Sequence, residues 1–126
     1  MQSFLMVALG GALGASSRYG IGRWLIHHGH TGLPWGTWIA NLVGCFLIGL
    51  ALPYLAHGSH KLYLLAIVGF LGAFTTFSTF SMDTLLLIGN GKSGAALFNI
   101  AGTVVIGFVL VWGGVQVAKL LGATWP

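Results

Sequence analysis

Charge of either sign is nearly missing from this sequence. Its 126 residues include one acidic side chain, Asp83, and five basic ones, so that only 5% of the chain is charged. One carboxylate cannot form a catalytic carboxylate pair, and the sequence has no Cys–His dyad and no complete phosphate-binding loop, so we do not expect an enzyme. The basic residues are scattered singly and give no cluster that could follow a phosphate backbone. The net charge of +4 therefore does not indicate nucleic-acid binding.

Cysteine is also scarce, which limits redox and metal chemistry. Cys45 is the single thiol, so we expect it to fill a gap between helices rather than to form a disulfide. His27, His28 and His30 cluster in one predicted loop, but no acidic or thiol side chain is close enough in sequence to complete a zinc site. We therefore favour an ordinary loop over a metal centre.

Apolar side chains are what the sequence has in abundance. They make up 56% of the chain, and a mean hydropathy of +0.93 is too high for a water-soluble domain of this size. A helix needs about 20 apolar residues to cross a hydrocarbon core of about 30 Å. We predict an all-α integral membrane protein, one domain over 1–126, with four transmembrane helices at about 4–26, 35–55, 62–88 and 95–121. Residues 1–3 carry no basic side chain, so we expect the first span to be a permanent helix rather than a cleaved signal.

Glycine and aromatic residues support a packed membrane domain. The chain has 21 glycines, and spacings such as Gly10-xxx-Gly14 and Gly69-xxx-Ala73 let helix backbones approach closely within lipid. Aromatic residues near the predicted span ends are typical of an interfacial belt. These residues are Trp24, Trp35, Trp38, Tyr54, Tyr63 and Trp125.

The basic residues outside the spans give almost no bias in orientation. Lys61 and Lys119 fall toward the side of the N-terminus, whereas Arg23 and Lys92 fall toward the opposite side. The positive-inside rule needs an excess on one side. Either a single charge decides one fixed topology, or copies insert both ways and pair as an antiparallel homodimer. We favour the dual topology, because four glycine-rich helices are too few to form a complete transport path without a second copy.

Polar residues within the spans concentrate near one surface. Arg18 is predicted roughly 12 Å below that surface and Asn41 roughly 9 Å, and Asn99 and Thr103 enter the same layer from the fourth span. Such residues inside a membrane generally have a functional reason. A guanidinium, an amide and a hydroxyl at one depth suggest a vestibule for an anion. Snorkelling of Arg18 and a structural interhelical hydrogen bond from Asn41 remain open alternatives.

The third span contains an unusual polar stretch, GAFTTFSTFSMD, at 72–83. Gly72 and Thr75 are predicted about 15 to 20 Å deep, near the bilayer midplane. Thr75 and Thr76 can hydrogen-bond to the backbone and locally unwind the helix. A break at that depth would expose carbonyl groups suited to a small cation, on the two-fold axis of an antiparallel pair.

Two phenylalanines follow the predicted break. Phe77 and Phe80 are three residues apart, which places them on one stripe of a helix. The edge of a phenyl ring carries partial positive charge, so ring edges and hydroxyl donors together could solvate an anion that has lost its water. On spacing alone, ordinary packing of the two rings is the better-supported interpretation.

Four motifs occur in this order along nearly the whole chain: GxxxGAxxR, GTWIANLVGCFLIG, GFLGAFTTFSTFS and NIAGTVVIGFVLVWGG. In these motifs the chain resembles the Fluc/CrcB family of small bacterial fluoride channels. The resemblance implies a fluoride-selective channel of the bacterial inner membrane that exports fluoride passively and confers fluoride resistance. It further implies an antiparallel dual-topology homodimer with two fluoride pores and a structural Na⁺ at the dimer centre.

The resemblance also implies roles for particular residues. Phe77 and Phe80 match the rings whose edges line the fluoride path, Asn41 the pore amide, and Arg18 the vestibule cation. Gly72 and Thr75 match the positions whose backbone carbonyls hold Na⁺. Candidate hydroxyl donors to fluoride are Ser78, Thr79, Ser81 and Thr103.

The chain departs from the family pattern at three positions. Asn99 and Gly107 stand where relatives often carry hydroxyl side chains, and Asp83 stands where a glutamate is expected. An interfacial role, a basic partner and a proton-linked role for Asp83 all stay open, of which we favour the first two. A small multidrug exporter would need a carboxylate in the first span, where this chain has Arg18 and no acid. An accessory subunit of a larger membrane complex is a further alternative.

Overall fold

The computed structural model describes residues 1–56 and 58–124, and this part of the chain is helical. The elements are α1 (Gln2–His27), α2 (Trp35–Leu55), α3 (His60–Tyr63), the π-helix η1 (Leu64–Leu71), α4 (Gly72–Phe74), α5 (Phe77–Gly89) and α6 (Ser93–Leu120). The predicted all-α fold class is confirmed. Trp125, which we predicted in the aromatic belt, lies outside the described residues.

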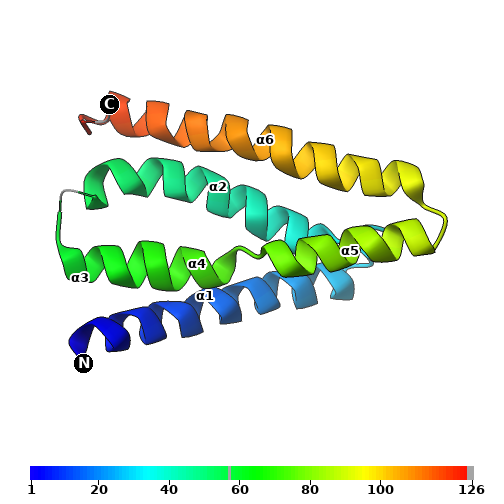
Figure 1. The fold of residues 1–126 in the computed structure, drawn as a ribbon, viewed down its shortest axis with the longest axis horizontal. Helices are drawn as coiled ribbons and strands as arrows, with labels where there is room; N and C mark the ends of the chain where they lie inside the picture. The colour runs from blue at the N-terminus through cyan, green and yellow to red at the C-terminus, as the bar shows by residue number, and fades with distance from the viewer. Residues whose placement is uncertain (57, 125–126) are drawn as a thin grey trace.

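The helices run back and forth along the long axis of the molecule (Figure 1). The start of α1, the ends of α2 and α6, and α3 lie at one end, and the turn from α5 to α6 lies at the other. Lys61 in α3 and Lys119 near the end of α6 therefore share the first end, while Arg23 and Lys92 lie toward the second. The structure thus agrees with the even distribution of charge that the sequence indicates.

Three helical stretches are long and apolar enough to cross a membrane: Trp35–Leu55, His60–Gly89 and Ser93–Leu120. They correspond to the predicted spans 35–55, 62–88 and 95–121, and the chain is a multi-pass membrane protein. The predicted first span, 4–26, is helical as part of α1 but is not one of the three. Glycines, serines and two arginines dilute its apolar residues.

Glycines bring α1 into backbone contact with η1. A Cβ atom on Gly10 would overlap the carbonyl oxygen of Leu65, and one on Gly14 would overlap that of Phe70. From the other side, a Cβ atom on Gly69 would lie 2.7 Å from the Val7 carbonyl oxygen and 3.0 Å from the Gly10 Cα atom. The predicted close packing at Gly10, Gly14 and Gly69 is confirmed.

A second backbone contact joins α2 to α6, and our sequence analysis did not single it out. A Cβ atom on Gly49 would overlap the Val111 carbonyl oxygen, and one on Gly114 would overlap the Phe46 carbonyl oxygen. The Tyr54 hydroxyl then donates a hydrogen bond of 3.0 Å to the Ala118 carbonyl near the end of this contact. The two glycine contacts divide the domain into α1 with η1 and α2 with α6.

The segment His60–Gly89 is not one regular helix. It winds as a π-helix over Leu64–Leu71, which the sequence pattern did not indicate, and it loses helical geometry at two residues. Thr75 has φ −87° and ψ 156°, and Thr76 has φ −152° and ψ 125°, so both are extended. The predicted break in the third span is confirmed and lies at Thr75 and Thr76.

Candidate functional site

The side chain of Asn41 from α2 binds the backbone of the break. The Thr76 N–H donates to Asn41 Oδ1 at 2.8 Å, and Asn41 Nδ2 donates to the Thr76 carbonyl at 3.0 Å. Asn41 is buried, with 8% of its surface exposed, so two hydrogen bonds remove most of the penalty for placing an amide there. The predicted interhelical hydrogen bond of Asn41 is present, and its partner is the backbone of the break.

The break begins α5 with a hydroxyl cap. Thr76 Oγ1 accepts a hydrogen bond from the Thr79 N–H at 3.3 Å, which satisfies one of the free donors at a helix N-terminus. At the first residue of the break, Thr75 Oγ1 donates to the Leu71 carbonyl at 2.9 Å. A Cβ atom on Gly44 would overlap Thr75 Cγ2, so a larger residue there would require the Thr75 side chain to move.

Arg18 reaches the break from α1. Its Nε atom donates to the Ala73 carbonyl at 3.2 Å, one residue before α4 ends. A cation at a helix C-terminus is favourable, because the final carbonyl groups there lack helical partners. Arg18 is therefore fixed to the protein backbone in this structure, although snorkelling toward water was an alternative.

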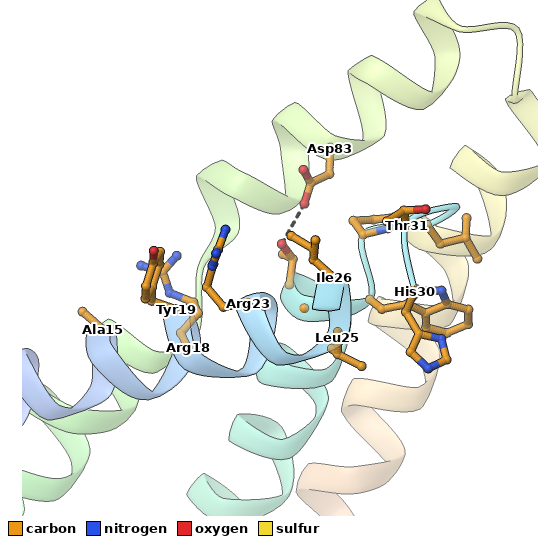
Figure 2. A pocket seen from close by; sticks show the side chains of 15 residues that line it. Ala15, Arg18, Tyr19, Arg23, Leu25, Ile26, His30, Thr31 and Asp83 are labelled. Atoms are coloured by element: carbon orange, nitrogen blue, oxygen red, sulfur yellow. Dashed lines mark hydrogen bonds between the residues drawn. The ribbon is translucent and has the colours of Figure 1, made fainter. Parts of the chain in front are cut away.

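Arg18 also lines a cavity of about 570 Å³ between α1, α5 and the segment that joins α1 to α2 (Figure 2). Arg23 of α1 and Asp83 of α5 extend toward the same space in Figure 2. The Asp83 carboxylate accepts a hydrogen bond of 2.7 Å from the Thr37 hydroxyl. The cavity thus combines two arginines with the one acid of the chain.

A second hollow, the break groove, has a volume of about 470 Å³ and runs along the break between α2, α5 and α6. It brings together six of the predicted site residues: Asn41, Gly72, Thr75, Phe77, Phe80 and Thr103. Most of its other lining residues are apolar, including Ile48, Ile67 and Val111. A mostly apolar groove with a few polar groups is typical of a ligand path rather than of a charged surface.

The two phenylalanine rings lie on the wall of the break groove. The centroids of Phe77 and Phe80 are 5.8 Å apart, with 41° between the ring planes. Phe77 is 80% exposed on this single chain, so the protein core does not cover its ring. Ordinary packing of Phe77 inside the chain does not account for its position.

The predicted hydroxyl donors do not all lie in the groove. Ser78, Thr79 and Ser81 are not among its lining residues, and Ser81 donates to the Phe77 carbonyl at 2.9 Å. Thr103 does line the groove, and its buried Oγ1 atom has no hydrogen-bond partner within residues 1–56 and 58–124. Thr103 is therefore the hydroxyl that this geometry favours as a donor to a ligand.

The structure separates the four polar residues that we predicted in one vestibule layer. Arg18 lines the first cavity, while Asn41 and Thr103 line the break groove. Asn99 lines neither, because it is buried, with 3% of its surface exposed, and Nδ2 donates to Thr84 Oγ1 at 2.8 Å. Thr84 in turn donates to the Phe80 carbonyl at 2.8 Å, so Asn99 connects α6 to the half-helix that carries the rings.

The structure shows what surrounds the positions at which the chain departs from the family pattern. Gly107 lines the break groove and lies close to Cys45, whose Sγ atom would be 3.3 Å from a Cβ at that position. The free thiol therefore occupies space beside Gly107, as the predicted gap filler. Thr37 and Thr84, which bond Asp83 and Asn99, were missed by sequence reasoning, because nothing in their local pattern indicates these partners.

Comparison with known proteins gives a consistent result. Residues 5–115 match the family model described as "CrcB-like protein, Camphor Resistance (CrcB)". A relative from a strain of Thermus thermophilus, named "Fluoride-specific ion channel FluC", is 42% identical over 123 residues, covering 96% of this chain and 97% of its own. Relatives with the same name from Acidobacterium capsulatum and Rhizobium etli are 45% and 43% identical. These two matches cover 97% and 96% of this chain and 100% and 98% of the relatives.

Proposed function

The chain belongs to the CrcB family, and from this premise we propose that it is a fluoride-selective channel that exports fluoride passively across the bacterial inner membrane. The observation that supports this most directly is the break groove. It places two phenylalanine rings, a buried amide and an unpartnered hydroxyl along one mostly apolar path. The family is one of ion channels rather than enzymes, which agrees with the lack of catalytic groups in the sequence.

Fluoride is small and strongly hydrated, so a selective path has to replace its water. The ring edges of Phe77 and Phe80 offer partial positive charge, and the hydroxyl of Thr103 and the remaining N–H of Asn41 offer hydrogen bonds. Each of these donors is weak compared with a full positive charge, which lets the ion leave as well as enter. A chloride ion fits poorly between fixed rings because it is larger.

The first cavity acts as the vestibule of this path. Arg18 and Arg23 raise the local concentration of anions there, since charges of one sign in a cleft attract mobile ions of the other. Two guanidinium groups face one carboxylate, that of Asp83, so the charged side chains that line the cavity carry an excess of positive charge. The bond from Arg18 to Ala73 keeps one of these groups close to the break.

The conducting unit is an antiparallel homodimer in which α1 is a fourth membrane-crossing helix of each subunit. The even distribution of basic residues between the two ends supports insertion in both directions. The exposure of Phe77 and of Phe108, 80% and 74% on a single chain, supports a partner that covers the groove. A second copy in the opposite orientation would complete two equivalent fluoride paths.

A Na⁺ ion at the dimer centre fits the residues of the break. The carbonyl groups of Gly72 and Thr75 have lost their helical donors, and both residues line the groove. Carbonyl oxygens are suitable ligands for such a hard cation, and unwound helix segments supply them in membranes. The ion supplies positive charge that holds the two subunits together.

Fluoride efflux from liposomes tests the proposed function. Purified protein is reconstituted into vesicles loaded with potassium fluoride, and external fluoride is measured with a selective electrode after valinomycin is added. We expect rapid fluoride release and no chloride release from matched potassium chloride vesicles. Vesicles that retain fluoride would contradict a channel, and release that requires a proton gradient would favour an exporter instead.

A further inference from the structure

The two extended residues of the break change the backbone hydrogen bonds on either side of it. In a continuous α-helix the N–H groups of residues 76–79 would bond the carbonyl groups of residues 72–75. The extended conformations of Thr75 and Thr76 interrupt this pattern. Each interrupted pair leaves one donor and one acceptor that need other partners.

Two side chains take the donors that belong to Gly72 and Thr75. The Thr76 N–H, the helical partner of the Gly72 carbonyl, donates to Asn41 Oδ1 at 2.8 Å. The Thr79 N–H, the helical partner of the Thr75 carbonyl, donates to Thr76 Oγ1 at 3.3 Å. The second bond of Asn41, from Nδ2 to the Thr76 carbonyl at 3.0 Å, fixes the orientation of the amide.

The residues whose carbonyl groups are released in this way both line the break groove. Of residues 72–75, only Gly72 and Thr75 line the break groove. The Ala73 carbonyl, which lies between them in sequence, is occupied by Arg18 Nε at 3.2 Å. The side chains therefore leave free the carbonyl groups of the two groove-lining residues, while Arg18 binds the Ala73 carbonyl.

We propose that the Asn41 amide and the Thr76 hydroxyl are positioning residues for the cation site. They act through the backbone, because each holds an N–H group that would otherwise return to a carbonyl ligand and turn it along the helix axis. This inference rests on the proposed Na⁺ at the dimer centre. It gives Asn41 two roles, since the same amide lines the fluoride path and keeps the Gly72 carbonyl free.

Substitutions of Thr76 isolate the hydroxyl. Thr76→Val preserves the branched shape but removes the acceptor, so the Thr79 N–H can return to the Thr75 carbonyl. Thr76→Ser preserves the acceptor and is the matched control. The measurement is the Tm of detergent-solubilised protein against Na⁺ concentration, with N-methylglucamine replacing Na⁺ at constant ionic strength. A ligand that binds only the folded state raises Tm with its concentration.

We expect the wild type and Thr76→Ser to share one Na⁺ midpoint. In Thr76→Val the midpoint should move to roughly tenfold higher Na⁺ or more, because one carbonyl ligand per subunit is withdrawn. A Thr76→Val protein with the midpoint of Thr76→Ser would overturn the role of the hydroxyl. If Thr76→Val does not fold, Thr76→Ala takes its place. A midpoint shifted to higher Na⁺ then supports the role of the hydroxyl, and the midpoint of Thr76→Ser overturns it.

Substitutions of Asn41 separate its two roles. Asn41→Asp keeps an oxygen acceptor for the Thr76 N–H but adds negative charge to the fluoride path, whereas Asn41→Leu removes the acceptor. We expect Asn41→Asp to keep the Na⁺ dependence of Tm and lose fluoride efflux, and Asn41→Leu to lose both. Loss of the Na⁺ response in both variants to the same extent would overturn the role of the amide.

The wild type distinguishes failure of this inference from failure of the proposed function. If the wild type releases fluoride but its Tm does not change with Na⁺ concentration, the cation site and this inference are overturned, whereas the proposed channel function is not. A Na⁺-dependent Tm without fluoride efflux would contradict the channel and leave the positioning residues supported.

Discussion

From the contact between α2 and α6 we predict opposite changes in stability when each of two adjacent glycines, Gly113 and Gly114, is replaced by alanine. A Cβ atom on Gly114 would overlap the Phe46 carbonyl oxygen and lie 2.8 Å from the Leu50 nitrogen, whereas one on Gly113 would meet nothing within 4 Å. The obstacles at Gly114 are backbone atoms of the facing helix, which cannot rotate away as a side chain can. Gly114→Ala therefore has to push the helices apart.

The size of the effect follows from the distances. Raising the 2.8 Å contact to an ordinary 3.4 Å requires the helices to separate by about 0.6 Å, and the Phe46 oxygen requires more. Overpacking of this kind costs about 1 to 3 kcal/mol. Alanine recovers about 0.5 to 1 kcal/mol of helix propensity at either position. We expect a net loss of about 1 kcal/mol for Gly114→Ala and a gain of about 0.5 kcal/mol for Gly113→Ala.

Reversible unfolding in mixed micelles, followed by circular dichroism, measures both free energies of unfolding. Gly20→Ala is a second control, since a Cβ there also meets nothing within 4 Å. Equal free energies for Gly114→Ala and Gly113→Ala would refute the argument that backbone approach, rather than glycine content in general, determines the packing of these helices.

Three further predictions concern the ion path. Phe77→Ile and Phe80→Ile each remove a ring edge, so fluoride efflux should fall sharply, while the dimer mass measured by light scattering stays unchanged. Unchanged efflux in both variants would show that the rings do not line the path. Thr103→Val should slow efflux roughly tenfold or more, because a hydrogen bond to a charged group contributes about 1.5 to 3 kcal/mol, whereas Thr103→Ser should conduct normally. Arg18→Gln should reduce efflux most at low ionic strength, and a deficit that persists unchanged in high salt would argue against a role in attracting anions.

The sequence predicted the features that depend on length and local chemistry. Span boundaries followed from the thickness of the bilayer, and the observed helices Trp35–Leu55 and Ser93–Leu120 agree with them within two residues. The break at Thr75 and Thr76 was predictable because hydroxyl side chains next to Gly72 compete for backbone groups. These signals lie within a few residues of the structure that they predict.

Features that depend on tertiary contacts were not predictable in the same way. The π-helix over Leu64–Leu71 lies against the backbone of α1 at Gly10 and Gly14, and no local residue pattern indicates it. The contact of Gly49 with Gly114 depends on two helices that are far apart in sequence.

The repeat Thr-Phe-Ser does not bring its serine side chains into the break groove together with its rings. Phe77 and Phe80 share one stripe of α5, and both line the break groove. Ser78 and Ser81 each follow a phenylalanine by one residue, which turns them about 100° around the helix from the rings. They consequently lie outside the groove lining. Thr103, the candidate donor that does line the groove, comes from a different helix and has no such repeat around it.

The break connects the two hollows of the molecule. Arg18 lines the first cavity and binds Ala73 just before the break, while Asn41 lines the groove and binds Thr76 within it. Any displacement of the residues between them changes the vestibule, the fluoride path and the released carbonyl groups together. Residues within one such network have non-additive effects. We therefore expect the proposed anion path and the proposed cation site to depend on the same few backbone hydrogen bonds of this chain of 126 residues, so that a single change at the break affects both.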